Sequence, residues 1–253
     1  MIINIGMRNS NLKNKSEYYI LGVMSGTSLD GIDLCLSSFQ FVTSWKFQII
    51  SAKTVEYSKV WKYRLRNAID LNPLDLEKLN QDYTQFLAEV IQSFMESCSD
   101  IVLDAVCSHG HTVFHEPAHG KTLQIGNLAV LANYLNKTLV CDFRTQDVAL
   151  GGQGAPLVPI GDALLFSEYD YCLNLGGFAN ISYEHKNDRI AFDICPVNIV
   201  MNYYSKILGL EFDDKGNFAA TGITHKALLE ELNNLSFYSK PHPKSLGLEW
   251  VQK

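Results

Sequence analysis

The sequence predicts an α/β fold with mixed sheets, built from two successive units. Strand-like residues 18–21 and 34–36 enclose a glycine-rich connection, and a third strand is expected over residues 47–55; together they indicate an antiparallel meander. A long amphipathic helix and a wholly apolar strand follow, which adds the helical layer. Residues 171–183 again contain a strand, a glycine pair and another strand, so the strand–glycine turn–strand order of residues 18–36 is repeated.

Within the first unit, apolar residues recur at steps of three and four over residues 74–98, which predicts an amphipathic helix. Residues 101–107 are apolar except for one aspartate, as is typical of a strand buried on both faces. The glycine and proline of residues 108–117 predict a loop after that strand. Asn127 is expected to cap a helix over residues 128–135.

The domain organisation follows from these elements. Residues 1–17 form a polar lead-in, residues 18–155 a first domain, and residues 156–253 the first part of a second domain. The boundary is placed after a glycine-dense connection, because the second strand–turn–strand arrangement begins soon afterwards. The third strand of the second meander ends at Asp193, and a helix is expected over residues 199–208.

Composition restricts the class of protein. The chain has 253 residues, of which 47% are hydrophobic and 19% charged, and this is enough for one large domain or two modest ones. The net charge of −6 argues against a nucleic-acid binder. No apolar run approaches the roughly 18 residues that span a membrane, and no signal peptide is evident. Six cysteines without a C-x-x-C pair indicate reduced thiols, so we expect a cytoplasmic protein.

Residues 22–33 combine three glycines, small hydroxyl side chains and the carboxylates of Asp30 and Asp33. Glycine allows backbone N–H groups to turn toward a bound oxyanion. The two carboxylates would repel a phosphate unless a cation bridged them. A phosphate site is one interpretation, and an ordinary hairpin turn is the other, since Gly, Ser and Asp are common in turns.

Polar side chains also follow two later strands. His109, His111 and His115 could suggest a metal site, but no H-E-x-x-H pattern is present, and a polar loop that binds sugar hydroxyls is the favoured reading. Arg144 follows the next strand and suits bidentate capture of a carboxylate or phosphate. An ion pair of Arg144 with Asp142 or Asp147 is the structural alternative.

Taken in order, the motifs are similar to those of the anhydro-N-acetylmuramic acid kinase family, within the sugar-kinase, Hsp70 and actin superfamily. The resemblance covers about residues 18–250. It rests on six segments: residues 22–31, Ser108-His109-Gly110-His111-Thr112, Gln124-Ile125-Gly126-Asn127, Asp142-Phe143-Arg144, residues 151–159 and residues 174–181. It implies an actin-like ATPase, ribonuclease H-like, two-domain fold.

The resemblance also implies a double reaction that serves peptidoglycan recycling. Water opens the 1,6-anhydro ring of anhydro-N-acetylmuramic acid at C1, and the freed O6 receives the γ-phosphoryl group of ATP, which gives N-acetylmuramic acid 6-phosphate. Asp193 matches the base that activates the water. Its structural alternative is a cap at the N-terminus of the following helix.

Ligand contacts are implied in the same way. Asp30 would hold Mg²⁺, directly or through water, and a homodimer is expected. The segments expected to bind ATP comprise Gly26, Thr27, Ser28, Leu29, Asp30, Gly31, Ile32, Asp33, Gly176 and Gly177. The residues expected to bind the sugar are His109, His111, Thr112, Gln124, Arg144 and Gln153, with Arg144 assigned to the lactyl carboxylate.

Three departures from the family pattern are evident. Cys195 and Val197 replace two glycines after the catalytic aspartate, which we read as a subfamily variant, and His111 stands where the family commonly has glutamine. The chain stops at Lys253, before the family's adenosine-binding motif, so a C-terminally truncated second domain is expected. The alternative functions are an inactive or sugar-binding-only fragment, or a related kinase with another substrate.

Overall fold

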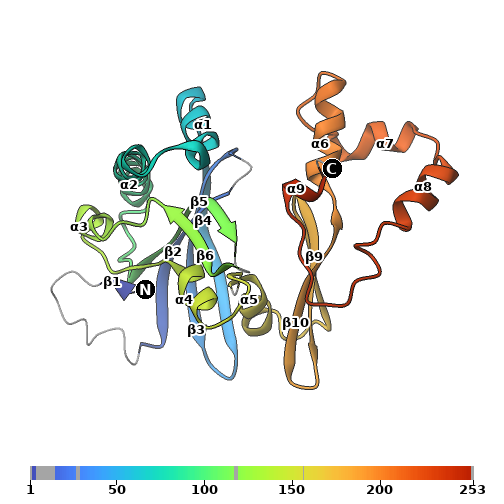
Figure 1. Ribbon diagram of the computed structural model, residues 1–253. Coiled ribbons are helices and arrows are strands. Elements are labelled where there is room, and N and C mark those ends of the chain that lie inside the picture. Colours follow the sequence, from blue (N-terminus) through green and yellow to red (C-terminus); the bar gives the residue numbers. More distant parts are fainter. Residues whose placement is uncertain (1, 4–14, 27–28, 117–118, 156, 252–253) are drawn as a thin grey trace. The chain divides into compact units, whose positions relative to one another are not determined.

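The computed structural model describes residues 2–3, 15–26, 29–116, 119–155 and 157–251. The chain divides into two compact units, Met1–Val158 and Pro159–Lys253, each with its own sheet (Figure 1). The assignment of residues 18–155 and 156–253 to two actin-like domains stays a prediction.

Within the described residues, the sheet of the first unit has seven strands in the order β1-β7-β5-β2-β3-β4, with β6 paired to β5. The meander β2–β4 is antiparallel, as predicted, and β5 pairs in parallel with both β2 and β7. The sheet is therefore mixed. Its strands are β1 (Ile2–Ile3), β2 (Glu17–Ser25), β3 (Gly31–Phe41), β4 (Trp45–Glu56), β5 (Ala105–Glu116), β6 (Lys121–Ile125) and β7 (Leu139–Cys141).

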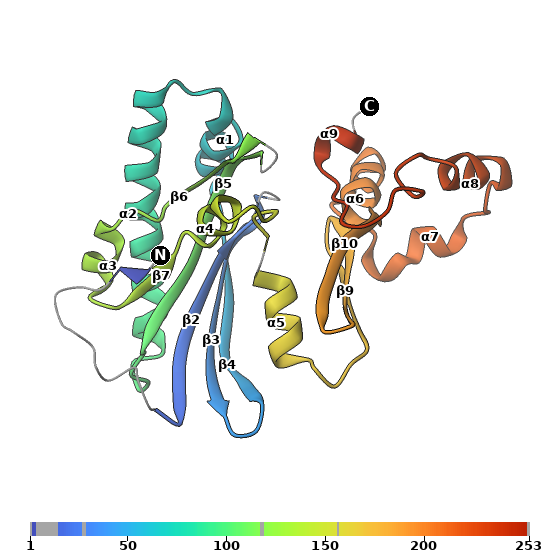
Figure 2. The same cartoon turned by 60° about the horizontal axis from the view of Figure 1, so that its bottom comes forward.

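Helices cover this sheet and enclose the hydrophobic core. They are α1 (Lys59–Arg66), α2 (Pro73–Ser97), α3 (Val130–Leu135) and α4 (Phe143–Ala149), with a short 3₁₀ turn at Ala68–Asp70. The predicted helix over residues 74–98 is confirmed as α2. The Asn72 side chain caps this helix, because it accepts hydrogen bonds from the N–H groups of Leu74 and Asp75. Helix α2 lies beside α3 (Figure 2) and buries Leu87 and Ile91 in one cluster with Leu21 and Ile32 of the sheet.

The predicted loop at residues 108–117 is wrong up to Glu116, because Ala105–Glu116 forms one strand, β5. Gly110 adopts a φ of 71°, which lets the strand bend without ending. The strand pairs with β2 on both sides of Gly110, since His111 still pairs with Ser25, and it pairs with β6 from His111 onward. The predicted cap is wrong too, since α3 begins at Val130 and the Asn127 amide donates to the carbonyl oxygen of His109.

Replacement of Gly110 by alanine should destabilise the protein at this bend. A Cβ there would lie 2.4 Å from Nδ2 of Asn127 and 2.6 Å from the carbonyl oxygen of Ile125. We expect Gly110→Ala to lower the free energy of unfolding by about 2–4 kcal/mol, from the positive φ and from overpacking together. Urea unfolding measures this, with Gly120→Ala as the matched control.

Gly120 has a similar φ of 67°, but nothing lies within 4 Å of its hypothetical Cβ. Gly120→Ala should therefore lower the free energy of unfolding only by the cost of the positive φ, which is about 1 kcal/mol. Equal losses for the two variants would contradict the clash at Gly110.

The second unit contains an antiparallel sheet with the order β10-β9-β8 in the part that the structure describes. Helix α5 (Leu157–Leu165) spans the division between the units, and α6 to α9 follow the sheet. The second predicted meander is thereby confirmed. Its elements are β8 (Tyr171–Leu175), β9 (Phe178–His185), β10 (Asp188–Pro196), α6 (Asn198–Ile207), α7 (Asn217–Thr221), α8 (Lys226–Asn233) and α9 (Leu248–Val251), with a 3₁₀ turn at Asp214–Gly216.

Candidate functional site

In the first unit, the bend of β5 brings His109 against Arg144 of α4. The Arg144 Nε lies 2.9 Å from Nε2 of His109, and Nη1 donates to the carbonyl oxygen of Gly154 at 2.7 Å. Because an arginine N–H only donates, Nε2 of His109 accepts, and the ring proton is on Nδ1, 2.8 Å from the carbonyl oxygen of Gly110. His109 is therefore neutral. Burial lowers its pKa, and the charge of Arg144 lowers it further.

Neither predicted ion pair of Arg144 is formed. The Asp142 carboxylate accepts from Thr145 Oγ1 at 2.6 Å, and Asp147 Oδ2 accepts from the backbone N–H of Gly154 at 2.7 Å. Asp147 thus holds the turn whose carbonyl oxygen binds Arg144. Sequence reasoning gave Asp147 no such role, although a turn with three glycines needs acceptors for its N–H groups.

A second chain of hydrogen bonds joins β5, β6 and the same turn. The carbonyl oxygen of Gln153 lies 3.0 Å from Nε2 of His115 and must accept, so Nδ1 accepts from Thr122 Oγ1 at 3.0 Å. Gln124 Nε2 donates to Thr122 Oγ1 at 2.8 Å and to Thr112 Oγ1 at 3.4 Å. The predicted sugar-binding residues His109, Thr112, Gln124, Arg144 and Gln153 thus lie in one connected region.

His111 lies deeper in this unit than its neighbours. Its side chain is 3% exposed, and its ring packs edge-on against Tyr83 with centroids 6.1 Å apart. Burial lowers the pKa of His111 to about 4. The imidazole is therefore neutral at physiological pH.

Buried polar atoms without a hydrogen-bond partner concentrate in the same region. Such atoms cost roughly 1–3 kcal/mol each, so a group of them calls for a functional reason. Among the described residues from 108 to 127 they are Ser108 Oγ, His111 Nδ1, Gln124 Oε1 and Asn127 Oδ1.

The glycine-rich connection between β2 and β3 is described apart from Thr27 and Ser28, which lie outside the described residues. Leu29 and Ile32 are core side chains, so only their backbone groups could meet a nucleotide. The Asp33 carboxylate accepts from Thr54 Oγ1 at 2.6 Å. The Asp30 side chain is exposed, and within the described ranges its carboxylate makes no hydrogen bond.

The exposed Asp30 carboxylate suits a cation that is held mainly by the phosphate oxygens of a bound nucleotide. The described residues contain no group of three or more metal-ligating side chains. Mg²⁺ is commonly held by one or two carboxylates together with phosphate oxygens and water. The Asp30 carboxylate, which makes no hydrogen bond with the described residues, lies beside a glycine-rich turn and fits that chemistry.

In the second unit, the turn Gly176-Gly177 meets the start of α6. The carbonyl oxygen of Gly177 accepts from the N–H groups of Val197 and Ile199 at 2.9 and 3.1 Å. The Asn198 amide donates to the carbonyl oxygen of Gly176 at 2.9 Å. These contacts fix the second glycine turn on the helix that follows β10.

Asp193 lies on β10 directly before a bulge in its pairing with β9. Its Oδ2 accepts from the backbone N–H of Leu246 at 2.7 Å, and burial raises the pKa of its carboxyl group. The alternative reading as a helix cap is wrong, because α6 starts after Val197 without a side-chain cap. A half-buried carboxylate with a raised pKa has the character of a general base.

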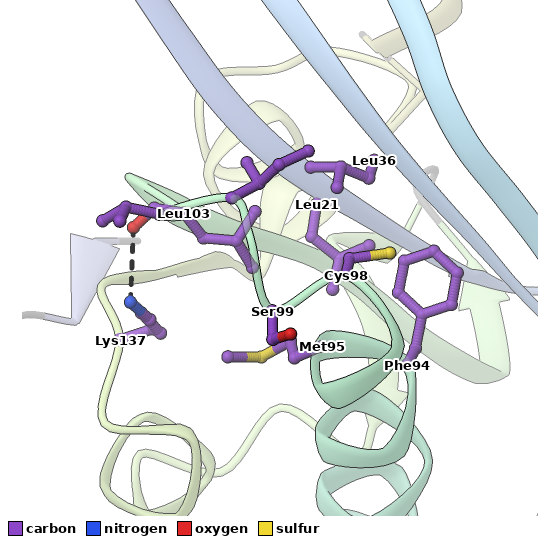
Figure 3. A pocket seen from close by; sticks show the side chains of 10 residues that line it. Leu21, Leu36, Phe94, Met95, Cys98, Ser99, Leu103 and Lys137 are labelled. Atoms are coloured by element: carbon purple, nitrogen blue, oxygen red, sulfur yellow. Dashed lines mark hydrogen bonds between the residues drawn. The ribbon is translucent and has the colours of Figure 1, made fainter.

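A cavity of about 260 Å³ lies away from these side chains, where α2 ends (Figure 3). Its one lysine, Lys137, donates to the carbonyl oxygen of Leu103 at 3.5 Å. Mostly apolar side chains line it, and none of the predicted site residues is among them: Leu21, Leu36, Phe94, Met95, Cys98, Ser99, Ile101, Val102, Leu103 and Lys137.

Two meanders with glycine turns, each followed by helices, make up a mixed α/β architecture of the class found in sugar kinases with the actin-like ATPase fold. The family model for anhydro-N-acetylmuramic acid kinase matches residues 17–252. The chain belongs to the anhydro-N-acetylmuramic acid kinase family.

Relatives carry that same name. The one from Haemophilus influenzae is 35% identical over 93% of this chain and 64% of its own length. Those from Pseudomonas fluorescens and Chromobacterium violaceum are each 36% identical, over 90% and 92% of this chain and 65% of their own lengths. The chain thus spans just under two thirds of the length of these relatives. Within the described residues, no helix combines the length and apolarity needed to cross a membrane.

Proposed function

We propose that the chain is an ATP-dependent kinase that opens the 1,6-anhydro ring of anhydro-N-acetylmuramic acid and phosphorylates O6. The family match across residues 17–252 carries this proposal. Asp193 supports it, since a half-buried carboxylate with a raised pKa lies on β10, the third strand of the second meander. The proposal extends to a cytoplasmic location and to a homodimer.

Asp193 takes a proton from water as the water oxygen bonds to C1 and the bond from C1 to O6 breaks. O6 then bonds to the γ-phosphorus of ATP, and ADP leaves. Backbone N–H groups of residues 26–33 and Gly176-Gly177 bind the phosphates. Asp30 would hold Mg²⁺, directly or through water, and the ion would supply neutralisation of phosphate charge there.

Arg144 binds the lactyl carboxylate of the sugar in this proposal. Its guanidinium is half-buried and already fixed by two hydrogen bonds, which favours capture of an anion. Thr112, Gln124 and Gln153 lie in the connected region around it and bind hydroxyl and N-acetyl groups.

Replacement of Arg144 by glutamine should mainly raise KM for the sugar. A charge-assisted hydrogen bond contributes about 1.5–3 kcal/mol, so we expect an increase of about 10- to 100-fold. Steady-state kinetics with varied sugar measures it, and Arg66→Gln on the exposed end of α1 is the control. An unchanged KM would remove Arg144 from the carboxylate site.

ADP release that depends on both the sugar and ATP, with a product of the mass of N-acetylmuramic acid 6-phosphate, tests the proposed function. Absence of that product from the purified chain would count against it.

A second candidate is sugar binding without phosphoryl transfer. It is favoured by the second unit, where Leu173 and Leu175 of the edge strand β8 are 57% and 59% exposed. Calorimetry separates the two candidates. Heat of binding with the sugar but none with Mg-ATP would favour the second one, and binding of both ligands would favour the kinase.

A further inference from the structure

His109 has no ring nitrogen left for a ligand. Nδ1 donates to the carbonyl oxygen of Gly110, and Nε2 accepts from Arg144. The ring is also 7% exposed, and the Asn127 amide holds the backbone oxygen of the same residue at 2.9 Å. A direct contact with the sugar therefore does not explain why a histidine stands here.

We propose that His109 is a positioning residue, whose neutral imidazole holds the guanidinium of Arg144 for an anionic ligand and releases it when protonated. This inference rests on the proposed function, in which Arg144 binds the carboxylate of the sugar.

The geometry around Arg144 supports this assignment. Nε is bound by His109 and Nη1 by the carbonyl oxygen of Gly154, while Nη2 makes no hydrogen bond with any residue that the structure describes. Asp147 in turn holds the N–H of Gly154 at 2.7 Å. An arginine fixed in advance on two sides presents its remaining edge with little loss of side-chain entropy on binding.

Protonation of the His109 ring would make its contact with Arg144 repulsive. Nε2 of a charged imidazole is a donor and would face the Nε–H of Arg144, so the hydrogen bond would become a repulsion. The groups that act on the ring are Arg144 from α4, and His115 and His111 from its own strand. Burial and the charge of Arg144 lower the pKa of His109, which keeps the ring neutral near pH 7.

Nitrogen-15 NMR of the imidazoles tests the contact without any ligand. We expect the ring proton of His109 on Nδ1, and a pKa that rises toward the ordinary value in Arg144→Gln, because the neighbouring charge is gone. A proton on Nε2, or a pKa that is unchanged in Arg144→Gln, would overturn the proposal.

Calorimetry with anhydro-N-acetylmuramic acid tests the consequence. His109→Phe, which lacks the acceptor, should raise the Kd by about tenfold or more, whereas His109→Gln can offer an amide oxygen and should restore most of the affinity. In the Arg144→Gln background, His109→Phe should add no further loss. The control is His119→Gln, since the side chain of His119 is 74% exposed.

Wild-type affinity in His109→Phe, or fully additive losses, would contradict a positioning role. If the wild-type chain bound no sugar, the proposed function would fail, and the NMR result alone would still decide whether His109 holds Arg144.

Discussion

Asp193→Asn is expected to lower kcat by about 10²- to 10⁴-fold, because that is the range that general-base catalysis contributes. The amide cannot take a proton from water. It can still accept the hydrogen bond from the N–H of Leu246, so the fold around β10 should persist. Steady-state kinetics with saturating sugar and ATP measures the loss, and thermal unfolding checks the fold.

Asp188→Asn is the matched control, since Asp188 is exposed at the start of the same strand. The pH profile gives a second criterion. A base must be ionised, and burial raises the pKa of Asp193, so kcat should fall as pH drops through that raised value. Full activity of Asp193→Asn in a folded protein would remove Asp193 from the chemistry.

His111 should make the chain sensitive to mild acid. An unfolded histidine titrates near pH 6.5, whereas burial lowers the pKa of His111 to about 4. Between these values the unfolded state binds more protons than the folded state. The contribution of His111 is therefore fully present above about pH 6.5 and is lost as pH falls toward 4, by about 3 kcal/mol at most.

His111→Gln, which has the residue common in the family, should flatten this loss. Urea unfolding at several pH values between 4.5 and 7.5 measures it, with His119→Gln as the exposed control. Burial also lowers the pKa values of His109 and His115, so the slope should shrink without vanishing. An identical slope in His111→Gln and the wild type would contradict a buried, neutral His111.

Periodicity predicted some of the regular elements. The apolar stripe of α2 and the strand pairs on either side of the two glycine turns follow from local patterns, because each pattern matches the period of its element. Gly110 misled the prediction at residues 108–117. A glycine that bends a continuous strand cannot be told from one that ends it by sequence alone.

The candidate site was predictable only as separate motifs. His109 and Arg144 are far apart in sequence, and their contact depends on the bend of β5 and on the start of α4. The same is true of Asp193 and Leu246, which a hydrogen bond joins. Motif resemblance supplied the residues, whereas their partners, tautomers and pKa values arise from tertiary packing.

The most direct test of the proposed reaction is turnover of anhydro-N-acetylmuramic acid by the purified chain with Mg-ATP in water enriched in ¹⁸O. We expect a 6-phosphate with one ¹⁸O atom at C1 and none in the phosphoryl group, since water attacks the ring carbon and ATP supplies the phosphorus. A phosphorylated sugar that retains its anhydro ring, label in the phosphoryl group, or no phosphorylated sugar at all would contradict it.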